Sequence, residues 1–81
     1  MSGTFYKLDF TKKKDLTSEE VEWLDDNFVP SDDGTFYVDE YSLQEVIADC
    51  EKAKETIPTE LVTIMKAEIE KSVNKGFSFS F

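Results

Sequence analysis

The sequence predicts a small α+β domain, in which three helices back an antiparallel sheet of about three strands in the order β-α-β-α-α-β. Three observations support this class. Apolar residues alternate with polar ones near both ends of the chain, three segments carry apolar residues at helical spacing, and two Ser/Thr-x-x-Glu patterns are typical of helix starts. The 81 residues allow one domain, spanning 1–81, and 40% hydrophobic content is enough to close a core.

The first predicted element is a half-buried strand over residues 4–10. Tyr6, Leu8 and Phe10 share one face of it, because side chains in a strand alternate between its two faces. Three consecutive lysines at 12–14 follow, and we expect them to form a basic surface loop.

The second predicted element is an amphipathic helix that begins after Thr17. Glu20, three positions further on, completes a capping box with Thr17. A narrow apolar stripe follows at i, i+3 and i+7, formed by Val21, Leu24 and Phe28. Pro30 ends this helix, and the turn at residues 31–34 leads into the next strand.

A second strand is predicted over residues 35–41. Ser42 and Glu45 make another capping box, so we expect a second helix from there to about Glu55. Pro58 then lies near the start of a third helix, where proline is tolerated.

The third helix is expected to end near Gly76, and its apolar face includes Val73. Residues 77–81 alternate strictly between Phe and Ser and form the last predicted strand. The core is expected to contain Phe10, Leu24, Phe28, Val46, Ile47, Ile64, Ile69 and Phe79.

Two absences argue against catalysis. The chain has no His, and all nine basic residues are Lys, so the usual acid–base group at neutral pH and the usual bidentate anion ligand are both missing. Cys50 is the one cysteine and lies on an apolar stripe, which favours a core position over a nucleophile or half of a disulfide. We predict a protein that is not an enzyme and uses no metal and no cofactor.

Charge is distributed unevenly along the chain. From Asp15 to Glu51 there are thirteen acidic residues and no Lys, within a formal net charge of −9. Such a field attracts cationic partners at rates that fall with salt. The predicted contact surface comprises Glu19, Glu22, Asp26, Asp32, Asp33, Asp39, Glu40, Glu45 and Asp49, with Trp23 as an aromatic anchor if it is exposed.

These features predict a protein that covers a basic, nucleic-acid-binding surface of a partner protein. Small, acidic, His-free proteins can imitate the phosphate charge of DNA, and phage-encoded inhibitors of host DNA-binding proteins have this charge profile. Direct binding of nucleic acid is disfavoured, because the overall charge repels phosphate.

Two alternatives belong to other classes of protein. The segment 31–40 resembles the second half of an EF-hand loop, with Asp32, Asp33 and Glu40 as Ca²⁺ ligands, although Val29 stands where the first Asp belongs. Alternatively, the chain is a structural or adaptor subunit that dimerises through Phe-rich strands at a sheet edge. Monomer and homodimer both stay open.

The sequence also suggests a compartment. Residues 1–10 have no basic start followed by an apolar stretch, so no secretory signal is predicted, and no apolar run is long enough to span a membrane. We therefore expect a cytoplasmic protein without a membrane partner.

Overall fold

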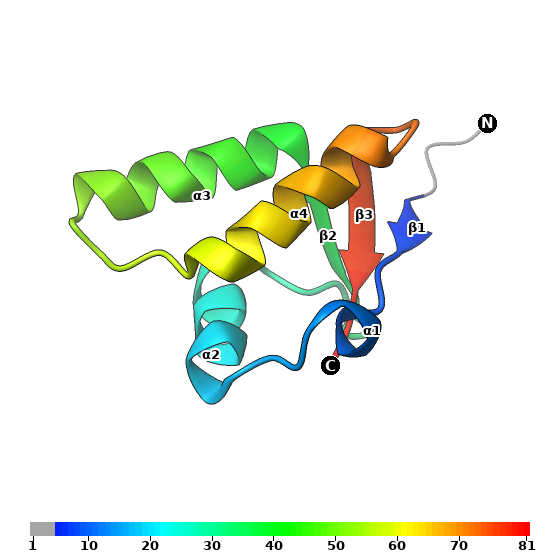
Figure 1. The fold of residues 1–81 in the computed structure, drawn as a ribbon, viewed down its shortest axis with the longest axis horizontal. Coiled ribbons are helices and arrows are strands. Elements are labelled where there is room, and N and C mark those ends of the chain that lie inside the picture. Colours follow the sequence, from blue (N-terminus) through cyan, green and yellow to red (C-terminus); the bar gives the residue numbers. More distant parts are fainter. Residues whose placement is uncertain (1–4) are drawn as a thin grey trace.

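The computed structural model describes residues 5–81 as a three-stranded sheet with helices packed against it (Figure 1). The elements in chain order are β1 (Tyr6–Lys7), α1 (Phe10–Lys13), α2 (Ser18–Asn27), β2 (Phe36–Asp39), α3 (Glu40–Lys52), α4 (Thr59–Lys71) and β3 (Gly76–Phe79). The predicted α+β class is confirmed, with the short α1 as an additional helix. Among the described helices, none has both the length and the apolar character that crossing a membrane requires.

The sheet is mixed, with strand order β1-β3-β2. β3 runs antiparallel to β2, with Val38 opposite Phe77, and parallel to β1, with Tyr6 opposite Phe77. The prediction of an antiparallel sheet is therefore right for one strand pair and wrong for the other. The hydrophobic alternation identifies strands but carries no information on their direction, and the last strand enters between the first two.

The first strand is shorter than predicted. Within the residues described, the strand covers Tyr6–Lys7 alone, and Thr4 lies outside them. The carboxylate of Asp9 accepts a hydrogen bond from the backbone N–H of Thr11 at 3.1 Å and caps α1, which begins at Phe10. A capping aspartate gives the backbone an alternative to the strand ladder. Consequently, part of the predicted basic loop is helical.

Helix α2 begins as predicted, with a complete capping box. The Thr17 hydroxyl accepts a hydrogen bond from the Glu20 backbone N–H at 3.1 Å, and the Glu20 carboxylate accepts one from the Thr17 backbone N–H at 2.9 Å. Two N–H groups that the first helical turn leaves without partners are thereby satisfied.

Helix α3 begins earlier than predicted. Its N-cap is Asp39 rather than Ser42, and Ser42 instead closes the box from inside the first turn. The Asp39 carboxylate accepts the Ser42 N–H at 2.8 Å, while the Ser42 hydroxyl accepts the Asp39 N–H at 3.0 Å. The helix also ends before Glu55, at Lys52, and Lys54 then takes a left-handed conformation with φ of 60°.

Helix α4 begins after Pro58 and ends before Val73, which is 96% exposed and therefore not part of the apolar face. Gly76 is the first residue of β3 and not the residue that ends the helix. A Cβ atom at Gly76 would lie 2.8 Å from ring carbons of Phe5 and 2.9 Å from the carbonyl oxygen of Val38. The glycine thus allows the close approach of these neighbours.

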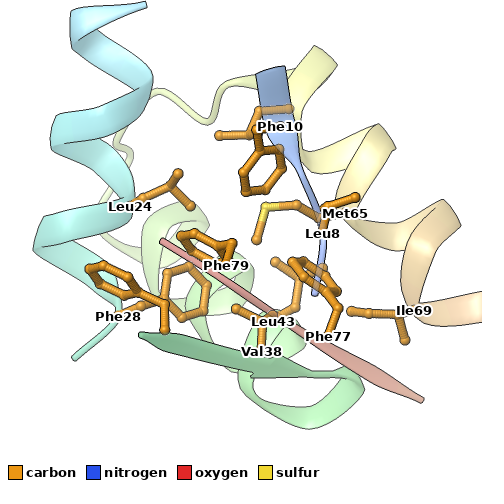
Figure 2. Close-up of a cluster of buried hydrophobic side chains, with 12 residues drawn as sticks. Leu8, Phe10, Leu24, Phe28, Val38, Leu43, Met65, Ile69, Phe77 and Phe79 are labelled. Carbon is orange, nitrogen blue, oxygen red and sulfur yellow. The ribbon is translucent and has the colours of Figure 1, made fainter. Parts of the chain in front are cut away.

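The core lies between the sheet and the helices, and phenylalanines dominate it (Figure 2). Phe79 stacks on Phe36 at 5.0 Å between ring centroids and meets Phe10 edge-on at 5.0 Å. Both arrangements are favourable for aromatic pairs. Five predicted core residues are buried and three are partly buried against the core; in sequence order, the five are Phe10, Leu24, Phe28, Ile69 and Phe79, and the three are Val46, Ile47 and Ile64.

Candidate functional site

Most carboxylates of the predicted contact surface are exposed and unpaired. Within residues 5–81, every ion pair uses Glu20, Glu60 or Glu68. The exposed carboxylates without an ion pair include Glu19, Glu22, Asp26, Asp32, Glu40, Glu45 and Asp49. Their charges therefore face solvent and are not neutralised by ion pairs within the fold.

Part of this surface surrounds a groove of about 910 Å³ between α2 and the segment that joins α3 to α4, which we call the α2 groove. The acidic side chains in its lining are Glu19, Glu20, Glu22, Asp26, Glu55 and Glu60. Lys14 and Lys54 are the lysines there, so the lining carries an excess of negative charge. A concave surface with an excess of negative charge concentrates its field on a bound cation.

Trp23 is an uncharged side chain in the lining of the α2 groove. It is partly buried, packs against the core, and lies 5.9 Å from the Phe28 ring centroid at an interplanar angle of 72°. Its indole Nε1 is buried and has no hydrogen-bond acceptor among the described residues. Trp23 thus contributes a partly covered ring to the groove, and its role as an anchor stays a prediction.

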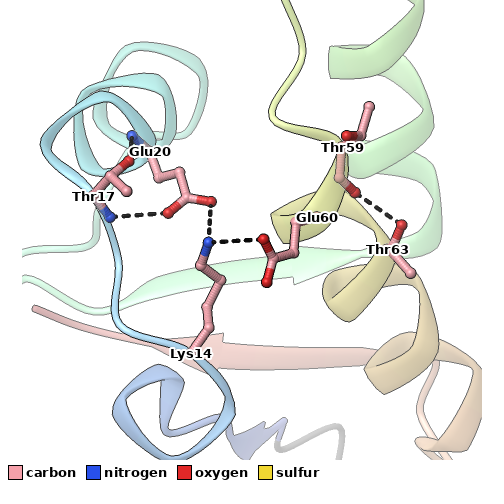
Figure 3. Close-up of polar contacts among 6 residues, drawn as sticks. All are labelled: Lys14, Thr17, Glu20, Thr59, Glu60 and Thr63. Atoms are coloured by element: carbon pink, nitrogen blue, oxygen red, sulfur yellow. Dashed lines mark hydrogen bonds and ion pairs between the residues drawn. The ribbon is translucent and has the colours of Figure 1, made fainter.

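One edge of the α2 groove is fixed by a cluster of three charges (Figure 3). The Lys14 ammonium lies 2.8 Å from the Glu20 carboxylate and 3.5 Å from that of Glu60. Burial would raise the pKa of Glu20, but hydrogen bonds from Lys14 and from the Thr17 backbone outweigh it and lower the pKa. Since Glu20 is 6% exposed and fully engaged, it serves the fold and not a partner.

A second cluster surrounds Glu68, which is also 6% exposed. Its carboxylate accepts a hydrogen bond from the Tyr6 hydroxyl at 2.7 Å and lies 3.3 Å from the Lys13 ammonium and 3.6 Å from that of Lys71. Burial would raise the pKa of Glu68, but the hydrogen bond from Tyr6 and the two lysines outweigh it and lower the pKa. The pKa of Tyr6 is raised, because the hydroxyl is partly buried and donates a hydrogen bond to Glu68.

These two clusters correct the prediction for the lysine triplet. Lys13 and Lys14 are not free charges of a surface loop, because they tie the N-terminal segment to α4 and α2. No local pattern identifies the role of Lys13, since its carboxylate partner, Glu68, lies far away in the sequence.

The turn after α2 shows no geometry that favours a Ca²⁺ site. Oδ1 of Asp33 accepts hydrogen bonds from the Ser31 hydroxyl at 2.6 Å and the Thr35 backbone N–H at 3.0 Å, and these bonds lower the pKa of Asp33. Asp39 is likewise occupied as the cap of α3. Within residues 5–81, no three or more His, Cys, Asp or Glu side chains are grouped closely enough to hold a metal ion.

The Phe-rich strand does not lie at a sheet edge, contrary to the dimer alternative. Phe77 and Phe79 belong to the central strand β3 and are fully buried. The hydrogen bond from Glu40 N–H to Lys75 C=O, at 3.2 Å, continues the β2–β3 ladder. Because partners alternate along an antiparallel ladder, Thr35, Tyr37 and Asp39 direct their backbone groups to the free edge of β2.

That free edge is largely occupied by local side chains. The Thr35 N–H donates to Asp33, and the Thr35 C=O accepts from the N–H and the hydroxyl of Ser31 at 2.9 and 3.0 Å. The Asp39 N–H donates to Ser42. A strand from another chain would find free backbone N–H and C=O groups at Tyr37 and at few other residues. This edge therefore offers little for pairing.

The structure therefore collects only part of the predicted contact surface into one place. Glu19, Glu22, Trp23 and Asp26 lie together in the α2 groove. Asp32 and Asp33 lie on the turn, Asp39 and Glu40 at the start of α3, and Glu45 and Asp49 along α3. Sequence reasoning missed Glu55 and Glu60, which the fold brings to the groove.

Comparison with known proteins adds no relative. No protein-family model, no curated protein and no solved structure matches this chain.

Proposed function

We propose that the protein is a non-enzymatic binding protein whose acidic surface occupies a basic, nucleic-acid-binding surface of a partner protein, in the manner of a DNA mimic or a phage-type inhibitor. The observation that carries this proposal is the α2 groove, in which exposed carboxylates without ion pairs surround a partly buried aromatic ring. Tryptophan is enriched among the residues that dominate the energy of protein–protein contacts, and the charged residues around such a contact steer the partner into place.

Three of these carboxylates form a row of negative charge along α2, which can imitate part of a phosphate row. Glu19, Glu22 and Asp26 follow one another at three and four residues on α2, which corresponds to about 4.5 and 6 Å along the helix axis. B-DNA carries one charge per about 3.4 Å on each strand. The helix thus presents a sparser row of negative charge.

The like charges also destabilise helix α2. Glu22 and Asp26 lie at i, i+4 on α2, and such a pair destabilises a helix by about 0.2–0.5 kcal/mol. A cationic partner would relieve this repulsion on binding. Binding is therefore expected to weaken steeply as salt increases.

Capture from a bacterial lysate tests the proposal. We compare the immobilised wild type with the variant Glu19→Lys/Glu22→Lys/Asp26→Lys and elute with a salt gradient. The matched control, Asp15→Lys/Asp25→Lys/Glu51→Lys, makes the same change in net charge at exposed positions that do not line the groove.

The proposal predicts a basic DNA- or RNA-binding protein that the wild type and the control retain and the groove variant loses. Retention of that protein by the groove variant, or elution that does not depend on salt, would contradict it. Nuclease treatment of the lysate excludes a bridge of nucleic acid.

A further inference from the structure

The α2 groove carries acidic side chains on two separate walls. Glu19, Glu22 and Asp26 line it from α2. Glu55 and Glu60 line it from the other side, at residues that follow α3 and begin α4. An occupant of the groove therefore meets negative charge on both flanks.

The fold itself places one cation between the two walls (Figure 3). The Lys14 ammonium lies 2.8 Å from the Glu20 carboxylate of α2 and 3.5 Å from the Glu60 carboxylate of α4. The side chain of Lys14 is 15% exposed, so this cation is largely withdrawn from solvent. At this edge of the groove, the walls are thus close enough for one ammonium group to contact carboxylates of both.

The other carboxylates of the lining have no such cation. Within residues 5–81, no ion pair involves Glu19, Glu22, Asp26 or Glu55. Lys54, in the same lining, is likewise without an ion pair among the described residues. Four carboxylates against one lysine leave an excess of three negative charges for a ligand from outside the chain.

The α2 wall presents its carboxylates at the spacing of one helix face. Glu19, Glu22 and Asp26 are three and four residues apart, which corresponds to about 4.5 and 6 Å along the axis of α2. Basic side chains at i, i+3 and i+7 of a helix that lies along α2 have the same spacing. Three side chains on one face of an extended chain, about 6.5 Å apart, overshoot this row by about 2.5 Å. A helix therefore matches the row more closely than an extended chain.

We propose that the α2 groove receives a basic helix of the partner protein, whose Lys or Arg side chains at i, i+3 and i+7 enter between the two walls. The groove, of about 910 Å³, is smaller than such a helix with its side chains, so the helix lies along the mouth of the groove. Its cations contact carboxylates of both walls, as Lys14 does at one edge. A helix is also the element that many proteins insert into the major groove of DNA. This inference rests on the proposed function and specifies which element of the partner is covered.

Two synthetic peptides of about four helical turns serve as probes. Both are alanine-based, with three lysines and no aromatic residue. The lysines occupy i, i+3 and i+7 in the one-face peptide, and i, i+5 and i+10 in the second peptide, which distributes them around the helix. Emission of Trp23, the one tryptophan of the chain and part of the groove lining, reports binding to the full chain. At low salt, we expect the one-face peptide to bind about fivefold more tightly, with an advantage that shrinks as salt increases.

Three charge reversals at exposed positions locate the binding site. Glu22→Lys on the α2 wall and Glu55→Lys on the opposite wall are each expected to weaken binding of the one-face peptide about fivefold, because an attractive pair becomes a repulsive one. Glu51→Lys is the matched control, since it makes the same change in net charge outside the lining, and it is expected to change the affinity about twofold at most. Unchanged circular dichroism of each variant shows that the fold is retained.

Three results would overturn the inference: equal affinity for the two peptides, no saturable change in Trp23 emission up to about millimolar peptide, or full binding by either wall variant. The proposed function is distinguishable from it, because that function requires only that the captured partner is lost by Glu19→Lys/Glu22→Lys/Asp26→Lys. Loss of the partner by this variant, together with its full retention by Glu55→Lys, would leave the proposed function in place and exclude a site with two walls.

Discussion

Substitution of Gly76 by alanine tests the packing of the central strand most sharply. The added Cβ atom would lie 2.8 Å from ring carbons of Phe5 and 2.9 Å from the Val38 carbonyl oxygen. The contact with Phe5 involves only its side chain, which can rotate away from the added methyl group. The Val38 oxygen belongs to the backbone of β2, which pairs with β3 opposite Phe77, so it can move only if the ladder is distorted.

The expected loss follows from this geometry. Insertion of one methyl group into a closely packed position costs about 1–3 kcal/mol. For a domain of this size, 1 kcal/mol shifts Tm by about 4–8 °C, so a loss of 2 kcal/mol lowers Tm by about 8–16 °C. The double variant Phe5→Ala/Gly76→Ala is expected to recover only part of the loss due to Gly76→Ala, because the contact with Val38 persists.

Thermal unfolding followed by circular dichroism measures these effects. Gly34→Ala is a contrasting control: Gly34 has φ of 84° and no atom within 4 Å of the added Cβ, so its loss arises from backbone strain and is insensitive to Phe5→Ala. A Tm of Gly76→Ala equal to that of the wild type would refute the assigned register of β2, β3 and Phe5.

Three further predictions concern capping, pH and metal. Thr17→Ala removes the cap of α2 and is expected to cost about 1 kcal/mol, measured by chemical denaturation; an unchanged midpoint would contradict the capping box. The pKa of Glu68 is lowered in the folded protein, so its ionised form stabilises the fold at pH values above the ordinary glutamate pKa of about 4.3. This stabilisation is lost as the pH falls from there through the lower pKa that Glu68 has in the folded protein. The Tm difference between wild type and Glu68→Gln is therefore expected to shrink below about pH 4.3, and a constant difference would oppose the assignment. Excess Ca²⁺ is expected to leave the fluorescence of Trp23 unchanged, whereas a saturable change would reinstate the EF-hand alternative.

The local patterns of the sequence predict the elements whose causes are themselves local. The capping box of Thr17 and Glu20 starts α2 at the predicted residue. For α3, two capping pairs compete, and the local pattern favours Ser42 with Glu45. The structure uses Asp39 with Ser42, since β2 ends at Asp39 and delivers the chain directly into the helix.

Long-range contacts explain what the sequence does not predict. Strand direction and the position of β3 between β1 and β2 depend on the path of the whole chain. The left-handed conformation of Lys54 ends α3 without the glycine that is typical of such positions. The α2 groove unites Glu22 with Glu55 and Glu60 only through folding, so the sequence predicted Glu22 as a contact residue but predicted neither Glu55 and Glu60 nor the shape of the groove.

The most direct test of the proposed function is a competition between this protein and duplex DNA for the partner isolated by capture. The affinity of the purified partner for labelled DNA is measured with increasing amounts of the wild type, the groove variant Glu19→Lys/Glu22→Lys/Asp26→Lys and the charge-matched control Asp15→Lys/Asp25→Lys/Glu51→Lys. We expect the wild type and the control to displace the DNA fully and the groove variant to leave it bound. Simultaneous binding of the protein and the DNA to the partner, or displacement by the groove variant equal to that by the wild type, would contradict it.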